Sequence, residues 1–143
     1  MKINCVIIFA MKMNGPVLEF RIYLEDTDVQ GIVYHANYLK YFERGRSEVM
    51  ELLGVPVAEV ARTDCRLVVY EIRTRFRRPA FLGDIIMVTT VMERSSEYRL
   101  IFKQEIRRKG ETEILVNGET DIVAIDENGN LKELPAFFNQ DTP

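Results

Sequence analysis

Two hydrophobic periods alternate along the chain, one of two residues and one of three to four. After Pro16, residues 17–24 alternate between apolar and polar side chains. One face of this segment carries Leu18, Phe20, Ile22 and Leu24. Alternation of this kind predicts a strand with one buried and one wet face.

The period changes at Asn37. Apolar or small residues then recur every three or four positions, at Tyr38, Phe42, Gly45, Val49, Leu52 and Leu53. This spacing predicts a helix with one apolar stripe, capped by Asn37 and ended by Gly54, with Pro56 just beyond it. Gly45 costs such a helix about 1 kcal/mol relative to alanine. A close approach of the helix to a sheet would explain it.

Most of the remaining chain is typical of strands joined by short turns. Four segments, 66–76, 84–94, 97–108 and 112–126, are rich in β-branched residues or alternate strictly. One strand, one helix and then about four further strands predict an α+β fold whose antiparallel sheet covers the helix stripe. The glycine within the helix favours a sheet curled round it.

Composition limits the classes of protein that fit. At 143 residues we expect a single domain, 1–143, with residues 1–15 as an additional or flexible N-terminal segment. The apolar run 3–10 is too short to span a bilayer. A net charge of −3 gives no basic field for nucleic acid. Cys5 and Cys65 do not make a disulfide framework, so we expect a cytoplasmic protein.

The candidate chemistry lies in EDTDVQGIVYHANY, residues 25–38, which contains the only histidine of the chain, His35. Asp26, Asp28 and Gly31 fit the start of a calcium loop, but Asn37 stands where that loop needs a bidentate glutamate. A predicted strand also precedes the stretch where a calcium loop needs a helix. A solvated acidic turn and a catalytic loop both stay open, and no metal is expected.

The order of the parts favours the catalytic interpretation. A carboxylate is followed by Gly31, by the apolar pair Ile32 and Val33, and then by the predicted helix start. The chain can therefore fold back so that the carboxylate faces free backbone N–H groups and the positive end of the helix dipole. A base or nucleophile beside an oxyanion site suits acyl transfer.

At these residues the chain resembles the hotdog-fold acyl-CoA thioesterases of the 4-hydroxybenzoyl-CoA thioesterase group, particularly the YbgC-type branch. The motif is YLEDTDVQGIVYHANYLKYFERGRSEVM, residues 23–50, and weaker similarity around RFRRPAFLGD, residues 75–84, extends to about Ile125. The resemblance implies a sheet wrapped round the central helix and a homodimer or homotetramer with sites between subunits. It also implies hydrolysis of a small acyl-CoA to acid and coenzyme A without a cofactor.

The resemblance assigns the catalytic carboxylate to Asp28, as nucleophile or general base, and the carbonyl-polarising backbone N–H to His35. The expected substrate-binding residues are Gly31, Val33, Tyr34, Tyr38, Arg77 and Arg78. The two tyrosines would equally suit the core, and the two arginines would equally suit a solvated strand face. Glu43 is expected to form a helix-surface or buried pair with Arg46, although some related enzymes take their carboxylate from this helix.

Two other functions are compatible with this fold. One is a non-catalytic module that binds acyl-CoA or an acyl-carrier protein, for which a carboxylate at Asp28 would be unnecessary. The other is a hotdog dehydratase, which the single histidine in a different motif disfavours. Acyl-chain specificity and delivery by coenzyme A or carrier protein stay open.

Overall fold

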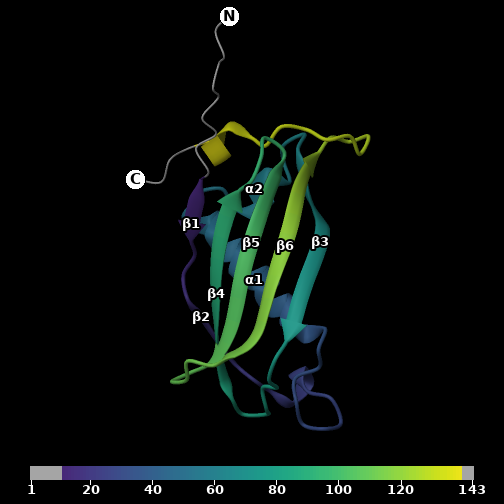
Figure 1. Cartoon of the computed structure of the whole chain (residues 1–143). Helices are drawn as coiled ribbons and strands as arrows, with labels where there is room; N and C mark the ends of the chain where they lie inside the picture. Colours follow the sequence, from purple (N-terminus) through teal and green to yellow (C-terminus); the bar gives the residue numbers. More distant parts are fainter. Residues whose placement is uncertain (1–10, 140–143) are drawn as a thin grey trace, which may run out of the picture.

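The structure is a computed structural model that describes residues 11–139 of the chain. One long helix, α1 (Asn37–Leu52), lies behind a sheet of six strands (Figure 1). The strands are β1 (Lys12–Asn14), β2 (Leu18–Arg21), β3 (Arg66–Phe76), β4 (Ile85–Arg94), β5 (Arg99–Arg108) and β6 (Ile114–Ile125). Short helical segments are η1 (Leu24–Asp26), α2 (Val57–Val60) and η2 (Ala136–Asn139). The predicted α+β architecture is confirmed.

The sheet is antiparallel, in the order β1-β4-β5-β6-β3, and β2 also pairs with β4. β1 pairs with residues 91–93 of β4 and β2 with residues 85–88, so the two short strands share one edge. β3 forms the opposite edge and pairs with β6 alone among the described strands. The apolar run 3–10 and Cys5 lie outside the described residues, whereas residues 12–14 of the predicted N-terminal segment belong to the sheet.

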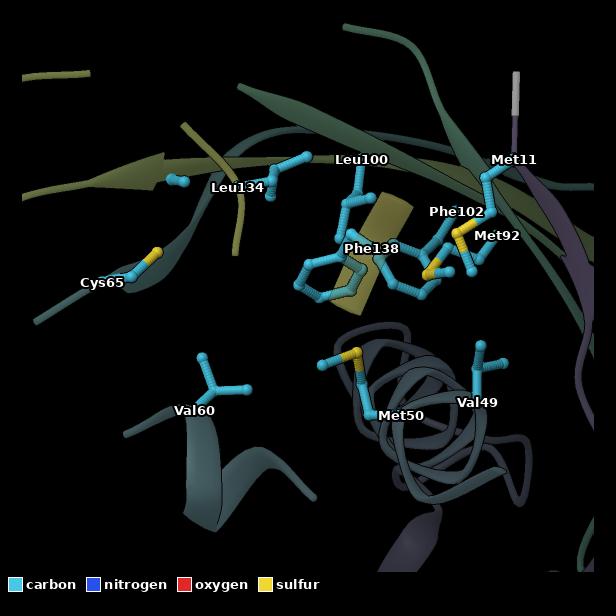
Figure 2. Packing of buried hydrophobic residues seen from close by; sticks show 11 residues of the cluster. Met11, Val49, Met50, Val60, Cys65, Met92, Leu100, Phe102, Leu134 and Phe138 are labelled. Carbon is cyan, nitrogen blue, oxygen red and sulfur yellow. The ribbon is translucent and has the colours of Figure 1, made fainter. Parts of the chain in front are cut away.

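Two apolar clusters fill the space between α1 and the sheet. The first, around the N-terminal half of the helix, contains Tyr38, Tyr41, Phe42, Ile86 and Ile106. The second contains Val49, Met50, Phe102 and Phe138, and Figure 2 shows the two helix residues directed toward the aromatic rings. Within the described residues no helix combines the length and apolarity needed to cross a membrane.

Gly45 occupies the point where α1 comes closest to the sheet. A Cβ at this position would overlap the Thr90 hydroxyl and lie 2.8 Å from Nε2 of Gln104. The space that was predicted for Gly45 is therefore required by two polar side chains of the sheet.

Three details of the prediction were wrong. The strand predicted for residues 17–24 ends at Arg21, because the Tyr23 N–H binds the Asp26 carboxylate at 2.8 Å and turns the chain into η1. Leu52 was predicted in the buried stripe but is 56% exposed, because the last buried residues of α1 are Val49 and Met50. Helix α2 was not predicted at all.

The helix termini agree with the prediction at one end only. Ala36, and not Asn37, is the N-cap, and it makes no side-chain capping bond. Asn37 is the first helical residue, and its side chain binds elsewhere. At the other end Gly54 has φ of 72° directly after Leu53, which confirms the predicted C′ position.

Candidate active site

The loop before α1 is a tight turn closed by backbone hydrogen bonds. Thr27 and Val33 form an antiparallel bridge, and the Asp28 N–H donates to the Ile32 carbonyl at 2.9 Å. The Gly31 N–H donates back to the Asp28 carbonyl at 3.1 Å, with φ of 76° at Gly31. A side chain would be strained in this left-handed conformation, so the glycine shapes the turn that presents Asp28.

Asp26 fastens this loop to the helix. Its carbonyl accepts hydrogen bonds at 2.9 Å from the Tyr34 N–H and from Nδ2 of Asn37. Its carboxylate accepts the bond from Tyr23 described above. Asp26 therefore has a structural role in its own loop, in keeping with the choice of Asp28 as the functional carboxylate.

The Asp28 carboxylate is half-buried and turns toward its own loop. One oxygen, Oδ1, accepts the Gln30 N–H at 2.8 Å, which is an Asx turn. This bond fixes the direction of the carboxylate. The side chain is thus oriented, although it does not belong to the lining of the adjacent pocket.

That pocket has a volume of about 220 Å³ and lies where three segments of the chain meet. An antiparallel bridge between Ile32 and Phe81 holds the loop against the segment that follows β3. The lining consists of Ile32, Val33, His35, Tyr38, Phe76, Arg77, Arg78 and Pro79. Five predicted site residues therefore come together here, namely Val33, His35, Tyr38, Arg77 and Arg78, whereas Asp28, Gly31 and Tyr34 are not in the lining.

His35 presents both its ring and its backbone at the start of α1. The ring is exposed, with its centroid 4.4 Å from that of Tyr34 and 6.3 Å from that of Phe76. Among residues 11–139 no backbone or side-chain acceptor pairs with the His35 N–H. A free donor at the positive end of a helix can bind the oxygen of a polarised carbonyl.

Tyr38 joins the helix to the wall of the pocket. It is buried, and its hydroxyl accepts the Ala80 N–H at 3.1 Å. Burial raises the pKa of the Tyr38 hydroxyl, so this group stays neutral and holds position. Tyr38 thus packs in the core and also lines the pocket, whereas its contact with a substrate stays a prediction. Tyr34 is exposed.

Arg77 and Arg78 stand at the rim, just beyond the end of β3. Their N–H groups both donate to the Leu115 carbonyl, at 2.8 and 3.0 Å. Nε of Arg77 donates to Oδ1 of Asn117 at 2.7 Å, and Nε of Arg78 to Oε1 of Glu113 at 3.0 Å. Both side chains are exposed. Each guanidinium therefore keeps further donors that an anion in the pocket mouth can use.

A wider hollow of about 570 Å³ continues outward from these two arginines. Arg107 on β5 also lines it and adds a third cation that the sequence analysis did not single out. A larger hollow of about 660 Å³ lies elsewhere, over the outward-facing charged residues of β3, β5 and β6. Many of those charges are already paired, so it makes a poorer site than the pocket beside α1.

The lining residues Ile32, Phe76 and Pro79 were missed by the sequence analysis. Phe76 lay within a predicted strand, and nothing in its spacing showed which residues it would face. Its place in the pocket depends on the bridge between Ile32 and Phe81, which is a contact between distant segments. The predicted Glu43–Arg46 ion pair is confirmed.

Comparison with known proteins identifies the family of this chain. The family model of the thioesterase-like superfamily matches residues 22–141. An acyl-CoA thioesterase YbgC of Helicobacter pylori is 40% identical over 87 residues, which is 60% of this chain and 62% of that protein. An acyl-CoA thioester hydrolase YbgC of Escherichia coli is 30% identical over 106 residues, covering 74% of this chain and 78% of that protein.

A solved structure is similar over most of its length. The crystal structure of a probable thioesterase from Bartonella henselae superimposes with a TM-score of 0.77 and 32% identity. The match covers 85% of this chain and 99% of that one. The sheet and central helix are therefore those of the hotdog fold. The match to the first curated relatives spans less than two thirds of their length.

Proposed function

From the premise that this chain belongs to the thioesterase-like superfamily, we propose that it hydrolyses a small acyl-CoA to free acid and coenzyme A. The observation that carries the proposal is that His35, whose N–H has no partner among the described residues, lines a pocket at the start of α1 together with Arg77 and Arg78. A donor that can polarise a carbonyl, the His35 N–H, and guanidinium groups that can bind an anion therefore belong to residues of one pocket. The names of the YbgC relatives support the same activity.

In this proposal the His35 N–H donates to the thioester carbonyl oxygen and stabilises the negative charge that develops there. Asp28 either attacks the carbonyl carbon to give a mixed anhydride that water then hydrolyses, or removes a proton from a water that attacks the carbonyl; in both routes the thiolate of coenzyme A leaves. A thioester is activated and has a good leaving group, so one carboxylate suffices. The turn at Gly31 fixes the backbone that carries Asp28, which supports this role.

Arg77 and Arg78 are proposed to bind phosphate groups of coenzyme A at the pocket mouth. Guanidinium groups bind phosphate with paired hydrogen bonds. Both arginines are exposed, and Arg107 widens the cationic surface on the outward side. Val33 and Tyr38 would then contact the substrate on the inward side. Gly31 and Tyr34 would act through the shape of the loop and the packing of the His35 ring.

We also propose that the protein is a homodimer, or a tetramer built from such dimers. β3 is an eleven-residue edge strand, with Val69, Tyr70, Ile72 and Phe76 exposed. An unpaired edge with apolar side chains is a template for pairing with a second copy. Ile72→Lys should convert the oligomer to monomer in light scattering, whereas Arg75→Gln should leave its mass unchanged. A wild-type monomer at micromolar concentration would contradict the proposal.

The cytoplasm is the proposed location, on the ground that two cysteines give no disulfide framework. In a reducing compartment Cys65 would persist as the free, buried thiol that the structure contains.

One observation favours a second candidate function, a binding module without catalysis. The Asp28 carboxylate is held by Gln30 and does not line the pocket, so it would have to turn or be completed by a second subunit before it acts. A protein that only binds acyl-CoA would need no such change.

The test is release of free thiol from a panel of acyl-CoAs with short aliphatic, long aliphatic and aromatic chains. Asp28→Asn keeps the Asx turn, because asparagine makes the same bond, but it removes the charge. We expect kcat to fall about a hundredfold or more. Glu25→Gln, an exposed change in the same acidic stretch, serves as control. Saturable binding without turnover in the wild type would favour the binding module.

A further inference from the structure

A second cavity lies between α1, α2 and the inner face of the sheet, with a volume of about 390 Å³. Most of its lining is apolar and comes from Met50, Val57, Val60, Cys65, Leu67, Val69, Leu100, Phe102 and Ile122. Figure 2 shows Met50, Val60 and Leu100 directed toward this space from α1, α2 and the sheet. We call it the α1–β3 groove. Its volume is at the lower end of the range for small-molecule sites.

Four polar residues, Glu43, Arg46, Ser47 and Arg66, interrupt this apolar lining, and the Ser47 hydroxyl donates to Oε1 of Glu43 at 3.3 Å. Arg46, whose side chain is 8% exposed, and Glu43, whose side chain is 58% exposed, both line the groove and form an ion pair. Nη1 of Arg46 donates to Oε1 of Gln104 at 3.2 Å and to Oγ1 of Thr120 at 3.4 Å. Nε of Arg46 has no partner among the described residues. The guanidinium is thus buried with incomplete hydrogen bonding.

The sheet holds this guanidinium in place. Nε2 of Gln104 donates to the Phe42 carbonyl and to Oγ1 of Thr90, both at 2.8 Å. Both ends of the Gln104 amide are therefore used, and its oxygen is directed at Arg46. A buried cation costs stability unless its partners are well arranged, and here the arrangement is fixed by β5 and β6.

The groove and the proposed thioester site border the same face of β3, along a track that is apolar except for Thr74. Phe76 lines the pocket beside His35, and Leu67 and Val69 line the groove. Ile72 lies between them on the same face of the strand, opposite Thr120. Four residues of strand separate Phe76 from Ile72, a distance of roughly 13 Å. The Glu43–Arg46 pair, which reaches Thr120, therefore lies about that far along the track.

The pair sets a chemical condition on what fills the groove. A plain hydrocarbon would remove water from Glu43 and return no hydrogen bond, which is unfavourable. A carboxylate would be repelled by Glu43. A hydroxyl group can accept from Arg46 and donate to Glu43 at the same time.

We propose that the α1–β3 groove takes the acyl part of the substrate and that Glu43 and Arg46 select acyl chains with a hydroxyl far from the thioester. The inference rests on the proposed thioesterase function and names its substrate class. The distance along β3 fits a medium-length chain hydroxylated at its far end. Binding, and not chemistry, is the step that the pair controls.

The experiment uses three coenzyme A thioethers that cannot be hydrolysed, with decanoyl, β-hydroxydecanoyl and ω-hydroxydecanoyl chains. Calorimetry should give about tenfold tighter binding of the ω-hydroxy ligand than of the decanoyl ligand, as expected for hydrogen bonds to charged groups. In Arg46→Met the two should bind equally. In Glu43→Gln the preference should fall to about threefold, because a neutral amide accepts more weakly.

A matched control is Arg62→Met, which breaks the exposed Glu59–Arg62 pair of the same spacing outside the groove. This variant should keep the tenfold preference. Should Arg46→Met fail to fold, the partly exposed Glu43→Gln decides the question. Equal binding by the wild type, a preference for the β-hydroxy ligand, or a preference unchanged in Glu43→Gln would overturn the inference.

The release of thiol from the corresponding thioesters separates the two proposals. Selective binding without turnover would refute the hydrolase and leave the groove assignment standing. Turnover of all three chains with equal kcat/KM, together with equal binding, would refute the groove assignment and leave the hydrolase standing.

Discussion

Helix α1 presents different chemistry at its start and in its middle. Just before its start, the N–H of His35 has no partner among the described residues, and this residue lines a pocket with an exposed cationic rim. Two to three turns later, the helix buries Arg46 against the sheet in a mostly apolar groove. At the helix start, backbone groups can polarise a carbonyl without a special side chain. In the groove, the proposed recognition depends on side chains. Mutations at the two places should therefore change different kinetic constants.

Gly45 gives the largest effect on stability, since it lies between the two regions. Gly45→Ala would gain about 1 kcal/mol of helix propensity but lose more to overlap with Thr90 and Gln104. We expect a net loss of about 1–2 kcal/mol in the free energy of unfolding, measured by urea denaturation. Glu48→Ala, on the exposed face of the same helix, should change it by less than about 0.5 kcal/mol. A stabilised Gly45→Ala would contradict the close approach.

Arg77 and Arg78 test the start of the helix. Arg77→Gln or Arg78→Gln should raise KM for acyl-CoA about fivefold each, with kcat little changed, because each removes one charge-assisted contact to phosphate. The effect should shrink as ionic strength rises. Arg75→Gln, on the outward face of β3, is the control. Unchanged KM in both variants, measured by thiol release at low salt, would mean that these arginines only cover the strand end.

Cys65 reports on the groove with the smallest expected effect. Burial raises the pKa of its thiol, so little thiolate is present at neutral pH. In a Cys5→Ser background, alkylation of Cys65 should be slow and should keep accelerating above the pH at which an exposed thiol levels off. A bound acyl-CoA thioether should slow it about threefold further, because Cys65 lines the groove. Mass spectrometry of the labelled protein measures the rate, and no protection would argue against occupancy.

The sequence predicted the secondary structure where a single period controls it. β3 was predicted at its observed bounds, and the helix and its terminal Gly54 were nearly correct. The errors lie where side-chain hydrogen bonds override the hydrophobic pattern. The Asp26 carboxylate binds the Tyr23 N–H, so the first strand ends before Tyr23. The Asn37 side chain binds the loop at the Asp26 carbonyl and does not cap the helix.

The sequence indicated several residues of the candidate site, but not which residues from distant segments would lie beside them. Asp28, His35 and Arg77 come from motif residues, and Phe76 joins His35 only because the loop pairs with the segment after β3. Arg46 shows a second limit. The sequence left open whether the Glu43–Arg46 pair lies at the surface or is buried, because the burial of Arg46 depends on Gln104 and Thr120, which lie 58 and 74 residues away.

The most direct test of whether Asp28 acts in the chemical step, and not in ligand binding, is to measure the affinity of Asp28→Asn for a ligand. A non-hydrolysable acyl-CoA thioether should bind this variant with the wild-type affinity, measured by calorimetry, while thiol release from the matching thioester is lost. That result would assign Asp28 to the chemical step. Loss of binding in parallel with turnover would contradict it, since Asp28 would then hold the loop or the ligand and the carboxylate of the reaction would have to be sought elsewhere.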